Sequence, residues 1–144
     1  MRRILFASDF SKSSHKAFAT AVAMARATGA TLTILHVVQL FTPIVPEQYI
    51  NTDTWDQIDR ESRRWSQHQL RRLTDRARKA GVRAVGLLRE GDPAEQITRA
   101  ARSTRADLLV VGTHGRTGLK KFFLGSVAGR VVVTASCPVV TVRG

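Results

Sequence analysis

Four residues in the C-terminal third of the chain have the types and the spacing to hold a phosphate group. Gly112 and Gly115 follow a short apolar run. Nine residues then separate Gly115 from the pair Gly125 and Ser126, which opens a segment with helical periodicity. Glycine lets backbone N–H groups approach a ligand, and a helix N-terminus adds unpaired donors and partial positive charge. The Ser126 hydroxyl and the Arg116 guanidinium suit a phosphate oxygen. The chemistry indicated is the binding of a phosphate-bearing ligand.

The same residues are compatible with a plain turn after a strand, followed by a helix that a serine caps. The residues alone leave both interpretations open. The segment is not a P-loop, because G-x-x-x-x-G-K-[ST] does not occur in the chain, and G-x-G-x-x-G is absent too.

Other side chains that could take part in binding or catalysis are scattered along the chain. Asp9 follows the first apolar run, where it either contacts a ligand or accepts hydrogen bonds from the N-terminal N–H groups of the next helix. His114 lies between two of the glycines and either faces a phosphate or is presented to solvent. His36, at a strand end, is expected to be a packed core residue, and Cys137 a buried small residue rather than a nucleophile. No His, Asp or Glu cluster has metal-ligand spacing.

The elements that position these residues follow from hydrophobic periodicity. Strands are predicted at residues 3–7, 31–38, 82–88, 107–111 and 138–142. Helices are predicted from a serine at 11, 13 or 14 to Gly29, at 55–80 with Gly81 ending it, from Asp92 to about 103, and at 126–135. A long connection without clear periodicity is expected at 40–54.

Strands that are apolar on both faces and alternate with helices indicate a parallel sheet covered on both sides. Right-handed crossovers make this a three-layer, doubly wound α/β fold. Ligands bind such sheets beyond the C-terminal ends of the strands, where the strand order reverses. The length of 144 residues fits one domain.

The long helix predicted at 55–80 has two faces. Its inner stripe is predicted to contain Trp55, Ile58, Trp65, Leu73 and Ala77. Its outer face is rich in arginine, but acidic residues interrupt the basic stripe. This pattern favours a solvated helix face over a dedicated nucleic-acid surface.

The composition bears on the partners of the protein and on its cellular compartment. The chain has 23 Lys and Arg against 11 Asp and Glu, a formal net charge of +12, which is compatible with acidic partners such as nucleic acid. Its single cysteine excludes an internal disulfide framework and a cysteine-based zinc cluster, and favours a reducing, cytoplasmic location. The N-terminal apolar run is too short for a secretory signal, and no stretch approaches the length of a membrane span.

The pattern G-x-x-G, nine residues, then G-S resembles the ATP-binding signature of the universal stress protein family. The flanking blocks are similar as well, at residues 4–11, 35–37, 91–94, 107–112 and 137–140. The resemblance covers essentially the whole chain, residues 1–144, as a single universal stress protein domain. It implies a five-stranded parallel sheet of order 3-2-1-4-5, the adenine nucleotide alpha hydrolase-like arrangement.

The resemblance also implies a set of ATP-binding residues, with or without Mg²⁺, and assigns no catalytic or metal-binding residue. The nucleoside would be contacted by Ala7, Ser8 and Asp9, and the adenine ring by Val37. The ribose and phosphates would be surrounded by Gly112, Thr113, His114, Gly115 and Arg116, and the phosphates held by Gly125, Ser126 and Val127. Ala7 departs from the family pattern, because many members have proline there.

The function expected from this resemblance is a nucleotide-dependent stress-response or regulatory module with slow or no ATP hydrolysis. An apolar edge strand from Pro138 to Val142 predicts a homodimer, and a further protein partner stays unidentified. An ATPase or phosphotransferase on the same fold is one alternative, although Asp9 is the only acidic residue expected near the phosphates. A basic nucleic-acid-associated protein is the second alternative.

Overall fold

The computed structural model describes residues 1–39, 47–49, 51–114 and 124–144 of the chain. Strands and helices alternate along it, as the periodicity predicts. The strands are β1 (Arg3–Ala7), β2 (Thr31–Val38), β3 (Ala84–Glu90), β4 (Leu108–Gly112) and β5 (Val139–Val142). The helices are α1 (Ser14–Thr28), the short 3₁₀ turn η1 (Glu47–Tyr49), α2 (Thr52–Lys79), α3 (Pro93–Ser103) and α4 (Ser126–Thr134).

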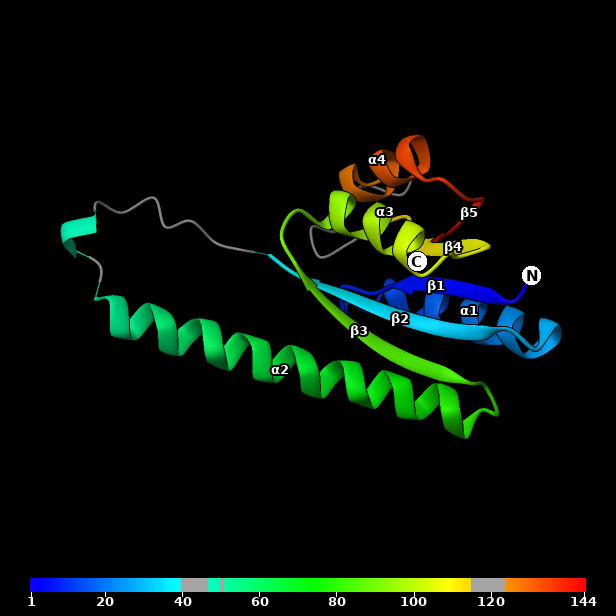
Figure 1. The fold of residues 1–144 in the computed structure, drawn as a ribbon, viewed down its shortest axis with the longest axis horizontal. Helices are drawn as coiled ribbons and strands as arrows, with labels where there is room; N and C mark the ends of the chain where they lie inside the picture. Colours follow the sequence, from blue (N-terminus) through cyan, green and yellow to red (C-terminus); the bar gives the residue numbers. More distant parts are fainter. Residues whose placement is uncertain (40–46, 50, 115–123) are drawn as a thin grey trace.

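The five strands form one parallel sheet in the order β3-β2-β1-β4-β5, which confirms the predicted fold (Figure 1). In register, Leu5 of β1 lies between Thr33 of β2 and Leu109 of β4. The strand order reverses at β1, because the chain runs outward to β2 and β3 on one side and to β4 and β5 on the other. The ends of β1 and β4 therefore flank the crevice where a doubly wound sheet binds ligands.

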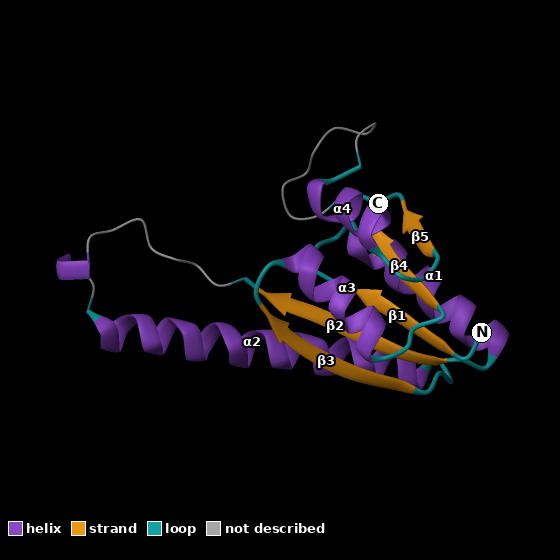
Figure 2. Cartoon of the chain, turned by 45° about the horizontal axis from the view of Figure 1, so that its top comes forward, coloured by secondary structure: helices purple, strands orange, loops and turns teal. Residues whose placement is uncertain are grey.

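Alternate residues of the central strands fill two separate cores, one on each face of the sheet. Ile4, Phe6 and Ile34 pack with α1 and α2 on one face. Leu5 and Leu35 pack with α3 and α4 on the other. This alternation follows from the two-residue period of a strand and makes the fold three-layered (Figure 2).

Helix α2 differs from its predicted form in where it packs. It begins at Thr52, three residues before the predicted start, and its buried residues lie between Ser66 and Ala77. The predicted inner stripe is right at Leu73 and Ala77 and wrong at Ile58, which is 50% exposed. Trp65 is also 50% exposed, but its ring contacts Phe10 of the first turn, so it faces inward in part. The N-terminal part of α2 extends past the end of the sheet (Figure 1), and there it has no sheet surface to cover.

The helix ends agree with the expected chemistry in two places and depart from it in two. Gly29 ends α1 with φ of 65°, and the Asp92 carboxylate caps α3 by accepting from the Glu95 N–H at 3.0 Å. Ser13 is the N-cap residue of α1, but its side chain makes no capping hydrogen bond. The N-cap of α4 is Gly125, so Ser126 is the first residue of that helix rather than its cap.

Two predicted segments fall largely outside the described residues, namely 40–46 and 50 of the expected connection and 115–123 of the glycine-punctuated stretch. Among the helices that the structure describes, none combines the length and the apolar character needed to cross a bilayer.

Candidate functional site

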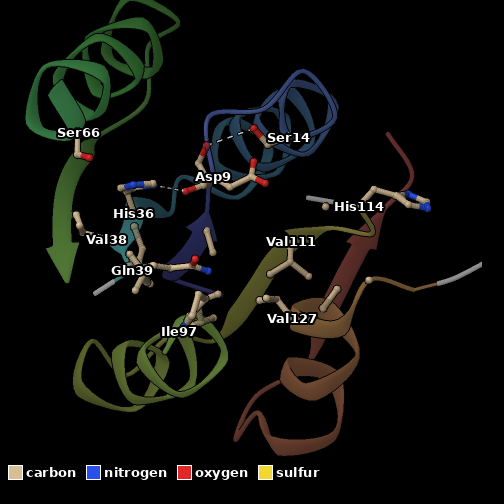
Figure 3. A pocket seen from close by; sticks show the side chains of 18 of the residues that line it. Asp9, Ser14, His36, Val38, Gln39, Ser66, Ile97, Val111, His114 and Val127 are labelled. Carbon is tan, nitrogen blue, oxygen red and sulfur yellow. Dashed lines mark hydrogen bonds between the residues drawn. The ribbon is translucent and has the colours of Figure 1, made fainter. Parts of the chain in front are cut away.

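A cavity of about 580 Å³ lies at the C-terminal ends of the central strands (Figure 3). It brings together ten of the twelve residues predicted to bind a nucleotide, from three strands and from the start of α4. These are Ala7, Ser8, Asp9, Val37, Gly112, Thr113, His114, Gly125, Ser126 and Val127. The other two, Gly115 and Arg116, lie outside the described residues.

The turn between β1 and α1 forms one wall of the cavity. The Ser8 N–H donates to the Leu35 carbonyl at 2.9 Å, which fixes the turn to β2. The Asp9 carboxylate accepts from the Ser11 N–H at 2.9 Å and from the Ser11 hydroxyl at 2.5 Å. Asp9 therefore lines the cavity and also holds the turn before the helix. These two hydrogen bonds are with Ser11, which lies in the turn ahead of α1.

His36 is buried at the end of β2, as predicted, and it also lines the cavity. Its Nδ1 lies 2.8 Å from the Ser8 carbonyl oxygen, and because a carbonyl only accepts, Nδ1 carries the hydrogen. Phe10, with φ of 63°, stacks on the imidazole at 4.1 Å between ring centroids. The Trp65 ring of α2 packs against Phe10 in a T-shaped arrangement, with 5.6 Å between ring centroids. This aromatic wall joins β2, the first turn and α2.

The crossing from β4 to α4 forms the opposite wall. The Gly125 N–H donates to the Thr113 carbonyl at 2.7 Å, so the chain on either side of residues 115–123 is drawn together. A Cβ atom added at Gly125 would lie 3.0 Å from that carbonyl oxygen. A larger residue would push on this carbonyl, so the close approach favours glycine at this position, and it places the N-terminus of α4 at the cavity.

Ser13 connects the two walls. Its hydroxyl donates to the His114 carbonyl at 2.9 Å, which links the start of α1 to the residues after β4. The His114 Nδ1 lies 2.9 Å from the Thr113 hydroxyl, and Figure 3 shows the imidazole directed away from Asp9 and His36.

Part of the lining could not be expected from the sequence, because it comes from helices that approach only in the folded chain. Helix α2 contributes Ser62, Trp65 and Ser66, and α3 contributes Pro93 and Ile97. Their only sequence signal is that small polar residues interrupt the apolar stripe of α2. These side chains give the cavity a far wall opposite the strand ends.

The electrostatics of the cavity favour an anion near α4. Of the described residues that line it, Asp9 alone is acidic. The N-terminus of α4 carries partial positive charge, and no acidic residue lies in its first turn. Within the described ranges, no three His, Cys, Asp or Glu side chains gather as a metal site. The arrangement can hold a phosphate by backbone N–H groups and an apolar ring against Val37, Val111 and Ile97.

Cys137 lies away from this lining and behaves as the sequence predicts. It is partly buried against the core under α3 and α4. Burial, and secondly the charge of Asp107, raises the pKa of its thiol. A raised pKa disfavours the thiolate, so the residue is unsuited to nucleophilic chemistry.

Comparisons with known proteins agree with this architecture. The family model described as "Universal stress protein family" matches residues 1–143. The chain is 35% identical over 150 residues to the universal stress protein YxiE of Bacillus subtilis, covering 98% of each chain. Its structure is similar to that of universal stress protein UspA from Lactobacillus plantarum, with a TM-score of 0.86 and 24% identity over 99% and 97% of the two chains. It is also similar to a universal stress protein crystallised in complex with cAMP, with a TM-score of 0.70 and 26% identity over 98% and 96%.

Proposed function

Because the chain belongs to the universal stress protein family, we propose that it binds ATP in the cavity at the strand ends and acts as a nucleotide-dependent regulatory module. The observation that carries the proposal is the convergence of the two walls. Asp9 and Val37 come from one side of the strand-order reversal, and Gly112 and Gly125 from the other.

The shape and chemistry of the cavity fit such a ligand. Its volume of about 580 Å³ lies within the range of roughly 300–1,000 Å³ that is usual for small-molecule sites. Apolar side chains on the α3 side would cover the adenine ring, and the N–H groups at the start of α4 would receive the phosphates. The similar protein in complex with cAMP supports an adenine nucleotide as the ligand class.

The proposed role is binding with slow or no hydrolysis. Efficient phosphoryl transfer needs an oriented nucleophile, metal ligands and cations at the transferred group. Asp9 is the single carboxylate among the described lining residues, and Ser11 already engages one of its oxygens. Mg²⁺ would reach the site mainly through the phosphates and water. ATP would then act by changing the affinity for a protein partner or for a second copy of the chain.

Isothermal titration calorimetry tests the proposal with two glycine variants of the same helix. Nucleotide-free protein is titrated with ATP and Mg²⁺, and we expect binding in the micromolar range. Gly125→Ala places a Cβ against the Thr113 carbonyl oxygen, so we expect affinity to fall by about tenfold or more. Gly129→Ala meets only ordinary contact with Leu124 and should leave binding unchanged.

The Gly129→Ala control also reports on folding, because alanine inside a helix is favoured over glycine by about 1 kcal/mol. Thermal unfolding should show it at least as stable as the unaltered chain. Absence of heat with ATP in nucleotide-free protein would contradict the proposal. Phosphate release at many turnovers per second would instead identify an ATPase or phosphotransferase.

A further inference from the structure

A second cavity of about 270 Å³ lies between α1 and α2. Ser8, Phe10, Ser14, His15 and Phe18 line it from β1, the first turn and α1, and Gln69, Arg72, Leu73 and Arg76 line it from α2. It shares Ser8 and Ser14 with the cavity at the strand ends. The remaining lining residues belong to this cavity alone, so the proposed nucleotide does not account for them.

The charge of this second cavity is entirely basic. Arg72 and Arg76 stand one helical turn apart and both line it, and no acidic side chain does. Two other arginines of α2 are paired, since Arg63 contacts Asp59 and Glu90, and Arg78 contacts Asp75. In the part of the chain that the structure describes, no ion pair engages Arg72 or Arg76. Two like charges at this spacing repel each other, and an anion between them would relieve the repulsion.

One of these two charges already has a contact within the cavity. The Arg76 guanidinium lies 5.0 Å from the centre of the Phe18 ring, and that ring is buried. A guanidinium stacked flat on a ring keeps its N–H edge available for an oxyanion. The first turn of α1, which supplies Ser14 and His15, contains no acidic residue and no side-chain cap. Its partial positive charge therefore adds to that of the arginines.

We propose that this second cavity binds a phosphate group carried by a small molecule, at a site separate from the nucleotide cavity. A small ligand fits better than a nucleic-acid strand, because strand binding relies on open aromatic faces for base stacking. Here Phe10 is already stacked on His36, and Phe18 is covered by Arg76. The inference does not depend on ATP binding elsewhere.

The experiment uses pyrophosphate as the probe and two double variants that remove equal charge from the same helix. Binding is measured by calorimetry in phosphate-free buffer. Salt at about 150 mM screens the long-range attraction between pyrophosphate and the basic surface. We expect Arg72→Gln with Arg76→Gln to weaken pyrophosphate binding by about tenfold or more, because guanidinium–phosphate contacts are charge-assisted. Arg64→Gln with Arg71→Gln changes two exposed arginines outside both cavities and should alter affinity by less than about threefold.

Further variants separate the two cavities and control for folding. Gly125→Ala should leave pyrophosphate binding at the α1–α2 cavity intact; loss in that variant with retention in the Arg72 and Arg76 pair would overturn the proposal. Equal weakening by both arginine pairs, or no binding at all, would overturn it as well. Arg76→Lys keeps charge over Phe18 and should retain part of the affinity. Displacement of pyrophosphate by a single-stranded oligonucleotide at the same salt would point to nucleic acid instead.

Discussion

Serine side chains hold the site together at the scale of single residues. The Ser11 hydroxyl contacts Asp9, the Ser13 hydroxyl reaches the His114 carbonyl, and the Ser14 hydroxyl donates to the Ser11 carbonyl at 2.8 Å. The first and third bonds stabilise the first turn itself, and the Ser13 bond connects that turn to the residues after β4. The two walls of the nucleotide cavity are therefore connected before a ligand bridges them.

A second residue-scale link joins α3 to α4 through Asp92. The Arg130 guanidinium donates to its carboxylate at 3.0 Å. This hydrogen bond first, and the Glu95 N–H second, lower the pKa of Asp92 below its ordinary value of 3.8. Because the folded pKa is the lower one, the carboxylate stabilises the fold above pH 3.8. That contribution is lost as the pH falls through the folded pKa.

Asp92→Asn tests this link, because the amide keeps a capping oxygen but loses the charge. We expect the free energy of unfolding at pH 7 to fall by up to about 1 kcal/mol, the usual range for an exposed ion pair. The difference from the unaltered chain should be smaller at pH 3 than at pH 7, because pH 3 lies below the ordinary pKa of 3.8 and the contribution of the carboxylate is lost as the pH falls. Urea denaturation at both pH values measures it. Asp56→Asn, which removes one negative charge at an exposed position on α2, is the control for the general effect of losing a surface carboxylate.

At the scale of elements, the two halves of α2 contribute unequally to the stability of the fold. Its C-terminal half packs so closely on β3 that a Cβ added at Gly86 would lie 3.0 Å from Leu70 Cγ. Its N-terminal half extends beyond the sheet (Figure 1). Between the two halves, Arg63 forms an ion pair at 2.8 Å with Glu90 at the end of β3. Only the packed half contributes to the core under the sheet.

Matched truncations of two aliphatic residues on this helix should therefore differ. Leu70→Ala removes a side chain that is 6% exposed and should lower the free energy of unfolding by about 2–4 kcal/mol. Ile58→Ala removes one that is 50% exposed and should lower it by less than about 1 kcal/mol. Chemical denaturation monitored by circular dichroism measures both. Equal losses would show that the N-terminal half of α2 has a packing partner in solution.

At the scale of the whole molecule, the sheet ends in two edges, and we propose that the β5 edge pairs two copies of the chain. β5 hydrogen-bonds to β4 on one side, where the Leu109 and Thr113 N–H groups donate to the Pro138 and Val142 carbonyls. Backbone groups alternate in direction along a strand, so the N–H of Thr141 faces the outer edge.

Thr141→Pro should shift the protein from dimer to monomer, because proline removes an outward N–H without touching the bonds to β4. Sedimentation velocity over a range of concentrations measures the change. Thr141→Val retains the N–H and should remain dimeric. A monomeric unaltered chain at high concentration would contradict the proposed pairing.

The sequence by itself determined the strands and helices of this protein and the position of the phosphate-binding candidates between a strand and a helix. Strands at residues 3–7 and 31–38 have the predicted bounds, and Gly29 and Asp92 end and begin helices as their chemistry requires. These features depend on local propensity and periodicity, which are properties of neighbouring residues. The strand order came from the family resemblance and is confirmed by the sheet.

Only the tertiary structure decided which residues of different elements contact one another. The contact from Ser13 to His114, the aromatic wall of Phe10, His36 and Trp65, and the basic cavity between α1 and α2 join residues far apart in sequence. The exposure of Ile58 depends on where the sheet ends, which the period of a helix does not encode. Such contacts arise when elements pack, so local patterns place a residue on an element but leave its partners undetermined.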